Sequence, residues 1–175
     1  SQAEHGPDSQ VIFVSLSKSL INEVEKCIND QVKSLDRIDF INKSISNSKL
    51  VFFEDKTMAI DFINLYAPEH YIINVQDESF FVDNIVSAGS VFIGNYTPES
   101  AGDYASGTNH TLPTNGNAKQ YSGVNLDSFQ KTITFQKISK TGLLNISKTV
   151  ETMAKAEGLQ AHKNAVSIRV KDLKS

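Results

Sequence analysis

VIFV at residues 11–14 is the first of four short apolar runs, followed by LVFF at 50–53, YIINV at 71–75 and SVFI at 90–93. The runs are rich in β-branched and aromatic residues and contain almost no polar residue, which is typical of strands buried on both faces of a parallel sheet. Gly94 directly follows the last run and predicts its end.

Segments with helical character lie between these runs. Ser17 and Asp55 are residues of the N-cap type, and apolar residues follow each of them at spacings of three and four. Pro68 predicts the end of the second helix, because proline disfavours helix in the residue before it. The predicted helices cover residues 17–35, 37–48 (with a Ser/Asn-rich turn), 55–67 and 80–86. Alternating strands and helices predict an α/β fold with a parallel sheet covered by helices.

The pattern changes after Gly94. Residues 94–125 contain five of the nine glycines and two of the four prolines, and they show little regular period. Loops of this length are uncommon and usually functional. We expect an α/β domain over residues 1–124 and a mainly helical tail over residues 125–175.

Within the tail we expect a short helix at residues 127–130, a strand at 132–136 and a helix capped by Ser139. The apolar stripe of that helix contains Leu143, Ile146, Val150 and Met153, and Glu157 is next in the series. A carboxylate on a buried stripe is costly unless it is paired or functional. Residues 159–173 are compatible with either helix or strand.

Composition excludes several classes of function. Hydrophobic residues make up 39% of the chain, and no apolar run approaches the ~20 residues of a membrane span. The net charge of -3 and the lack of a Lys/Arg stripe argue against a nucleic-acid partner. Cys27 is the single cysteine, which rules out an internal disulfide and favours a reducing compartment such as the cytoplasm.

Polar residues that could carry chemistry gather near the four histidines. Gln2 and His5 are three residues apart, so both could reach one cation from a helical turn, and His is a common zinc ligand. Glu69 and His70 are adjacent bases with different intrinsic pKa values, which suits a reaction with two proton transfers. They lie at a helix-to-strand junction, opposite the usual ligand crevice of an α/β sheet, which counts against a site there.

Two further groups complete the candidates. Asp103 and His110 lie in the Gly-rich segment, and Glu157 and His162 lie near the end of the chain. Each group also has a structural interpretation, since most lone histidines are surface or core residues and the Gly-rich segment could be a hydrogen-bonded turn. The spacing by itself matches no general metal-binding pattern.

Five stretches taken together resemble histidinol dehydrogenase, and they occur in that family's order. They are SQAEHGPD at residues 1–8, APEH at 67–70, SVFIG at 90–94, TPESAGDYASGTNH with LPT at 97–114, and AEGL with AHKNAV at 156–166. The resemblance covers essentially the whole chain. It implies an incomplete Rossmann-like domain and an oxidation of L-histidinol, through L-histidinaldehyde, to L-histidine with reduction of NAD.

The resemblance also implies a role for each candidate. It implies zinc ligands at Gln2, His5, Asp103 and His162, which would hold the substrate through the metal. It implies that Glu69 activates water for the second oxidation and that His70 accepts the hydroxyl proton. His110 and Glu157 would contact the substrate. The family exchanges its carboxy-terminal segments within a homodimer, so Glu157 and His162 would complete the partner's site.

The resemblance leaves the nucleotide site outside this chain. No Gly-rich phosphate loop follows a strand here, and members of the family are more than twice this long. We therefore expect the carboxy-terminal part of a longer enzyme, inactive by itself. A stand-alone zinc- or imidazole-binding module without catalysis is the alternative, and a zinc hydrolase is a weaker one because no hydrolase spacing of zinc ligands is present.

Overall fold

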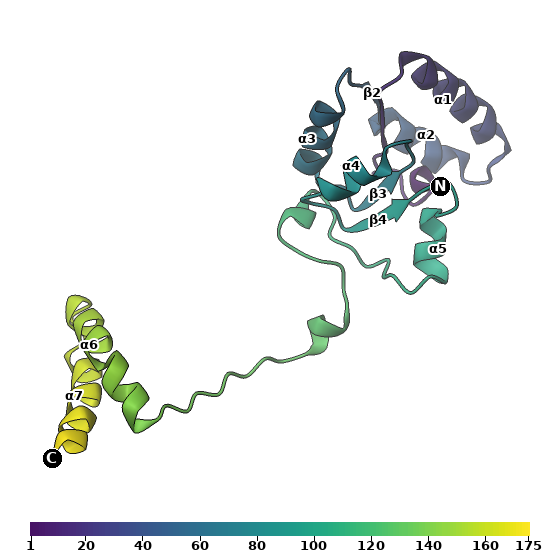
Figure 1. Cartoon of the computed structure of the whole chain (residues 1–175). Helices are drawn as coiled ribbons and strands as arrows, with labels where there is room; N and C mark the ends of the chain where they lie inside the picture. Colours follow the sequence, from purple (N-terminus) through teal and green to yellow (C-terminus); the bar gives the residue numbers. More distant parts are fainter. The chain divides into compact units, whose positions relative to one another are not determined.

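Two parallel pairs of strands form the β-structure of this computed structural model, which describes all 175 residues. β1 (Ile12–Ser15) pairs with β2 (Lys49–Phe52), and β3 (His70–Ile73) pairs with β4 (Ser90–Ile93) (Figure 1). The parallel strands and intervening helices confirm the predicted α/β class.

The prediction of one continuous sheet is wrong at the level of hydrogen bonding. β2 and β3 are not paired, so the structure contains two sheets of two strands each. The two pairs meet through side chains, because Val14 of β1 packs against the buried cluster that includes Tyr71 and Ile73 of β3. Apolar runs predict strands, but they do not determine which strands share a ladder.

The predicted helices between the strands are present. α1 (Lys18–Gln31) begins after Ser17, whose side chain accepts a hydrogen bond from the Leu20 N–H, and α3 (Lys56–Tyr66) begins after Asp55, which accepts from two backbone N–H groups. α3 ends at Ala67, with a left-handed φ of 54°, directly before Pro68. The remaining elements of this part are α2 (Ile38–Asn47), α4 (Glu78–Asp83) and the 3-10 segments η1 (Gln2–Glu4), η2 (Val32–Ser34), η3 (Asn117–Lys119) and η4 (Leu126–Phe129).

One further helix lies in the segment for which the sequence showed no regular period. α5 (Glu99–Tyr104) follows β4 and contains a glycine, Gly102, in its interior. Glycine weakens helix propensity, and six residues are too few for an apolar stripe to be visible. The helix was therefore not predicted.

The core of this part lies between α3, β3 and α4. Ala59, Ile60 and Ile63 of α3 pack against the inward-facing residues of β3 and against Phe81 of α4. Ile73 is 2% exposed and its neighbour Ile72 is 51% exposed, so β3 buries one face and presents the other outward.

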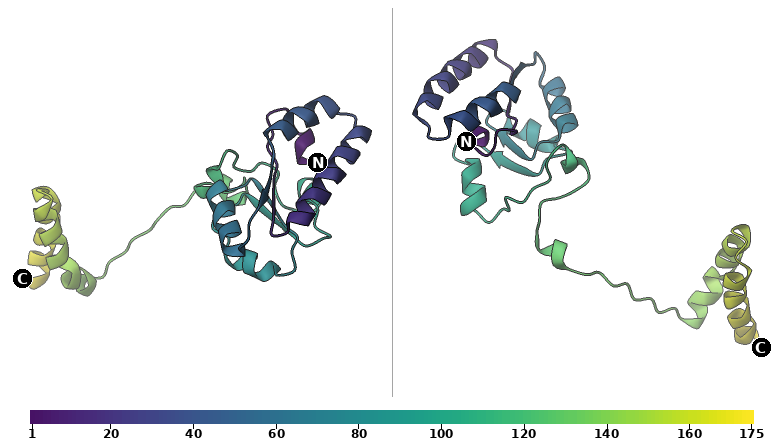
Figure 2. Two further views of the ribbon diagram at one scale, coloured as in Figure 1. Left: turned by 90° about the horizontal axis from the view of Figure 1, so that it is seen from above. Right: turned by 180° about the vertical axis from the view of Figure 1, so that it is seen from behind.

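The chain divides into two units, residues 1–129 and 130–175. The second unit consists of α6 (Lys140–Ala156) and α7 (Gln160–Lys174), which pack side by side (Figure 2). α7 settles the ambiguity of residues 159–173 in favour of helix. The predicted strand at residues 132–136 is wrong, because residues 130–139 contain neither helix nor strand and no other strand pairs with them.

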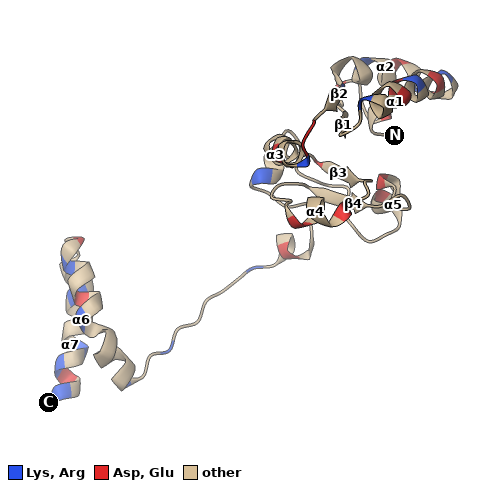
Figure 3. Cartoon of the chain, turned by 45° about the horizontal axis from the view of Figure 1, so that its top comes forward, with Lys and Arg blue, Asp and Glu red and all other residues tan.

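The two units differ in charge. Residues 130–175 contain nine Lys and Arg against three Asp and Glu, whereas residues 1–129 contain eight against seventeen (Figure 3). No helix has the length and apolar character needed to cross a membrane.

Candidate metal and acid–base site

Three side chains with metal-ligating atoms converge in the first unit. The ligating atoms of His5, Glu99 and Asp103 all lie within 4.8 Å of one another. Two of the three, His5 and Asp103, were predicted as metal ligands, and Glu99 was not. Glu99 is 3% exposed, whereas His5 lies at the surface.

The amino-terminal segment brings Gln2 and His5 to this place. Ser44 of α2, which is fully buried, donates a hydrogen bond to the Ser9 carbonyl at 2.9 Å. The Val11 N–H donates to Ser48 Oγ at 2.9 Å, directly before β1 begins. These bonds hold the chain that leads from η1 into β1 against α2, so His5, the residue that ends η1, has a defined position.

α5 supplies both carboxylates of the cluster. Glu99 and Asp103 are four residues apart, so a helix places them on one face. A Cβ at Gly102 would lie 2.6 Å from Cε1 of Phe92 on β4, so only glycine allows α5 to approach β4 this closely. The Thr108 hydroxyl donates to the Gly102 carbonyl at 3.1 Å and holds the following turn against the helix.

Glu69 and His70, the predicted bases, lie at the start of β3. The Glu69 carbonyl accepts a hydrogen bond from the Ser90 N–H at 2.9 Å, and a Cβ at Gly89 would lie only 2.5 Å from that carbonyl oxygen. The His70 side chain is 8% exposed, and its Nε2 lies 3.7 Å from Oε1 of Glu99. Glu99 of α5 thus lies beside the first residue of β3. This is the amino end of the strand, opposite the usual ligand crevice of an α/β sheet, where the sequence argument counted against a site.

Several buried polar atoms of this region have no hydrogen-bond partner. They are Nε2 of Gln2, Nε2 of His70 and Oε1 of Glu99. Buried polar atoms without partners are rare, and each calls for an explanation such as a bound ion or a functional role. All the atoms of this kind belong to residues in or beside the His5–Glu99–Asp103 cluster.

The donor set suits a divalent metal ion. One imidazole nitrogen and carboxylate oxygens are ligands that zinc accepts, and the Gln2 carbonyl oxygen could add another. The unpaired atom of Gln2 is its amide nitrogen, which is a hydrogen-bond donor and not a metal ligand, so it calls for a hydrogen-bond acceptor and not for a cation.

The other predicted site residues lie elsewhere. His110 is exposed, in a turn that is held by Asn109, whose amide donates to the Val124 carbonyl at 2.7 Å. Glu157 and His162 are exposed residues of the second unit. Glu157 does not continue the apolar stripe of α6, as the sequence suggested, because it is the residue that ends the helix, before Gly158 with a φ of 73°.

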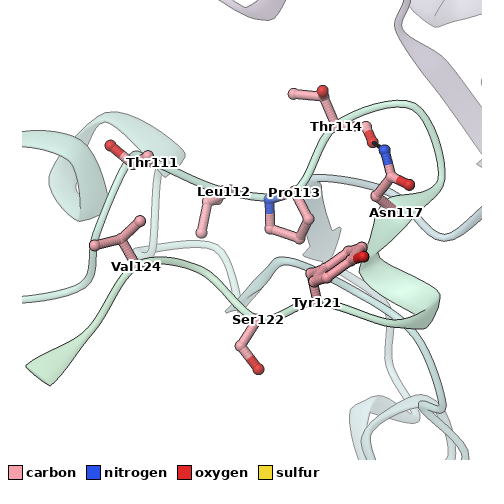
Figure 4. Close-up of a pocket in the computed structure, with 8 residues that line it drawn as sticks. All are labelled: Thr111, Leu112, Pro113, Thr114, Asn117, Tyr121, Ser122 and Val124. Atoms are coloured by element: carbon pink, nitrogen blue, oxygen red, sulfur yellow. Dashed lines mark hydrogen bonds between the residues drawn. The ribbon is translucent and has the colours of Figure 1, made fainter. Parts of the chain in front are cut away.

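A separate open pocket of about 360 Å³ lies after His110 in the chain (Figure 4). Apolar and hydroxyl side chains line it, and it includes none of the candidate residues. The lining residues are Thr111, Leu112, Pro113, Thr114, Asn117, Tyr121, Ser122 and Val124. This lining offers no titratable group apart from a tyrosine, whereas the cluster contains an imidazole and two carboxylates.

Comparison with known proteins gives a consistent result. A family model described as histidinol dehydrogenase matches residues 1–170. The chloroplastic histidinol dehydrogenase of Arabidopsis thaliana is 56% identical over 100% of this chain and 38% of its own length. The histidine biosynthesis trifunctional protein of Saccharomyces cerevisiae is 50% identical over 99% of this chain and 22% of its own length.

A solved structure agrees with these matches. The crystal structure of histidinol dehydrogenase from Elizabethkingia anophelis is 50% identical, has a TM-score of 0.94, and is matched over 99% of this chain and 40% of that one. The chain therefore spans about two fifths of the length of the single-function relatives it matches.

Proposed function

The chain belongs to the histidinol dehydrogenase family, and from this premise we propose that it forms part of a zinc-binding, NAD-dependent enzyme that oxidises L-histidinol to L-histidine. The observation that carries the proposal is the convergence of His5, Glu99 and Asp103, with His70 beside Glu99. The reaction would proceed in two oxidations, first to L-histidinaldehyde and then to the acid. The two parallel pairs of strands would belong to the incomplete Rossmann-like domain over residues 1–124 that the resemblance implies.

Two side chains would move protons in this reaction. His70 would accept the hydroxyl proton of the alcohol as the hydride leaves its carbon. Glu69 would activate the water that adds to the aldehyde before the second hydride leaves. The two oxidations remove protons from different groups, which is why two bases are needed.

Four residues would hold zinc, which when bound supplies a fixed attachment point for substrate nitrogen atoms. Gln2, His5 and Asp103 would come from one copy of the chain, and His162 from the exchanged segment of a second copy. Glu157 of that segment and His110 would contact the substrate.

The charges of the two units support such an exchange. The excess of Lys and Arg in residues 130–175 complements the excess of Asp and Glu in residues 1–129. Opposite charge steers association and favours the correct partner. The boundary of the exchanged segment, which we expected at residue 125, remains a prediction.

NAD would bind outside this chain, so residues 1–175 alone would be inactive. The expectation of a reducing compartment such as the cytoplasm also remains a prediction. The Arabidopsis relative carries the word chloroplastic in its name.

The test is isothermal titration of zinc into the metal-free full-length protein that contains these residues. We expect Asp103→Asn and His162→Ala to weaken zinc binding at least about tenfold, since each removes one ligand. Asp8→Asn, an exposed carboxylate near the same segment, is the matched control and should bind zinc normally.

The outcomes separate the candidate functions. Zinc binding that weakens on dilution in the wild type, but not in His162→Ala, would support the exchanged dimer. Zinc and imidazole binding without any oxidation of L-histidinol would favour the non-catalytic module. Zinc binding that is indifferent to Asp103 would contradict the proposed site.

A further inference from the structure

Glu99 is a buried carboxylate without a cationic partner from Lys or Arg. Its side chain is 2% exposed, and the ion pairs that involve Lys or Arg are Lys33–Asp30 and Lys56–Asp77, both far from it in the sequence and at the surface. An unpaired carboxylate removed from water destabilises the folded state. A residue placed at this cost needs a donor or a positive charge to face it.

The two oxygens of Glu99 point to different neighbours. Oε2 accepts a long hydrogen bond, 3.5 Å, from the Ser1 hydroxyl of the amino-terminal segment. Oε1 has no hydrogen bond and lies 3.7 Å from Nε2 of His70, which also has none. An acceptor and a donor, both buried and both unmet, therefore face each other just beyond hydrogen-bond distance.

The surrounding packing holds this pair in place. The His70 ring stacks on Phe92 with centroids 6.0 Å apart, and Phe92 is 4% exposed. Phe92 in turn lies against Gly102 of α5, the helix that carries Glu99. The Phe92 ring thus contacts both His70 and the helix that carries Glu99. A movement of about 0.8 Å would bring Nε2 of His70 within hydrogen-bond distance of Oε1 of Glu99.

We infer that Glu99 is a positioning residue for His70, with Oε1 accepting the Nε2–H of the imidazole. This hydrogen bond selects the tautomer that keeps its lone pair on Nδ1, so Nδ1 is the atom that takes the substrate proton. The carboxylate also balances the positive charge that the imidazole then carries, as the buried carboxylate does in other acid–base groups built on histidine. The inference rests on the proposed role of His70 as the base.

A role through the metal is the competing explanation, since Glu99 also lies in the cluster with His5 and Asp103. A double-mutant cycle separates the two roles. If Glu99 acts through His70, its removal changes nothing once His70 is gone; if it acts on the metal or the substrate, the loss persists.

The experiment uses the full-length enzyme with zinc, and compares Glu99→Leu, His70→Asn and the double variant. We expect Glu99→Leu to lower kcat at least about 100-fold while KM for L-histidinol stays within about threefold, because a misplaced base affects the chemical step. In the His70→Asn background the same change should alter kcat less than about twofold. Ser100→Ala, an exposed neighbour on α5, is the control for the helix.

Proton NMR of the metal-free protein gives a second readout. Wild type should show a low-field His70 Nε2–H resonance protected from exchange, and Glu99→Leu should lose it. Glu99→Gln covers the case in which the leucine variant does not fold: its amide oxygen should retain the resonance, while kcat falls because the charge is gone.

Wild-type kcat in the Glu99 variants, a change confined to KM, or an undiminished effect in the His70→Asn background would overturn the inference. Wild-type kcat in His70→Asn alone would instead overturn the proposed role of His70. In that case the NMR resonance still decides whether Glu99 and His70 are bonded.

Discussion

Gly102 of α5 lies against the ring of Phe92 so closely that a Cβ at residue 102 would be 2.6 Å from Cε1. Because Phe92 is 4% exposed and also stacks on His70, its ring has little room to move. The distance between α5 and β4 therefore depends on residue 102 being a glycine. The positions of Glu99 and Asp103 on α5 depend on it as well.

Gly102→Ala tests this dependence. We expect the variant to lose about 1–3 kcal/mol of unfolding free energy, because overpacking displaces a buried ring or the helix, and to bind zinc more weakly. Urea denaturation and zinc titration measure the two effects. Combining it with Phe92→Leu should cost less than the sum of the single changes, and strict additivity would show that the contact does not matter.

Gly89 lies against the backbone of Glu69, the residue before His70. A Cβ there would lie 2.5 Å from the Glu69 carbonyl oxygen, which already accepts the Ser90 N–H at 2.9 Å. We expect Gly89→Ala to displace the backbone of Glu69 and His70 and to lower kcat of the full-length enzyme at least about tenfold. Ser90→Ala keeps the backbone bond and is the control. Equal activity of the two variants would count against the prediction.

Ser139 should stabilise the second unit through its cap. Its side chain accepts the Gly142 N–H at 3.0 Å at the start of α6. We expect Ser139→Ala to lower the unfolding free energy of the α6–α7 pair by about 1 kcal/mol, and Ser139→Asp to retain it. Circular dichroism during urea denaturation measures the effect. Thr141→Ala, an exposed change within the same turn, should be close to neutral.

Tyr71 should make the stability fall at high pH. Burial raises the pKa of its hydroxyl from 10.0 to about 12, because the charged form is poorly solvated in the core. The unfolded chain then releases its proton first, so the stabilisation is complete below pH 10 and is lost as the pH rises to about 12.

We expect Tyr71 to account for a loss of unfolding free energy on the order of 2 kcal/mol as the pH rises from 10 to about 12. Denaturation of wild type and Tyr71→Phe across the same pH range isolates the contribution from that of the lysines. The phenylalanine variant should show a smaller loss of stability, and identical pH dependence in the two proteins would rule the contribution out.

Local patterns predicted most of the elements. The apolar runs located all four strands to within a residue or two, and Ser17, Asp55 and Ser139 each cap the helix that was expected after them. These features depend on neighbours in the chain, such as an N–H three residues away, and are therefore visible in the sequence.

The two errors have separate physical causes. Residues 132–136 carry β-branched and aromatic residues, but a strand needs a ladder partner, and none is adjacent. α5 was missed because its interior glycine lowers helix propensity, although the same glycine is what allows the helix to pack on Phe92.

Local patterns along the chain were enough to predict the α/β class and the positions of the strands and most helices, and the motifs were enough to indicate the family. They also indicated His5 and Asp103 as neighbours of one site. Two features became visible only in the folded chain: the strands form two separate pairs, and the carboxylate beside His70 is Glu99. Both relationships depend on how distant segments approach one another in the folded chain. The approach of Glu99 to His70 depends on the packing of α5 against Phe92, which the absence of a Cβ at Gly102 allows.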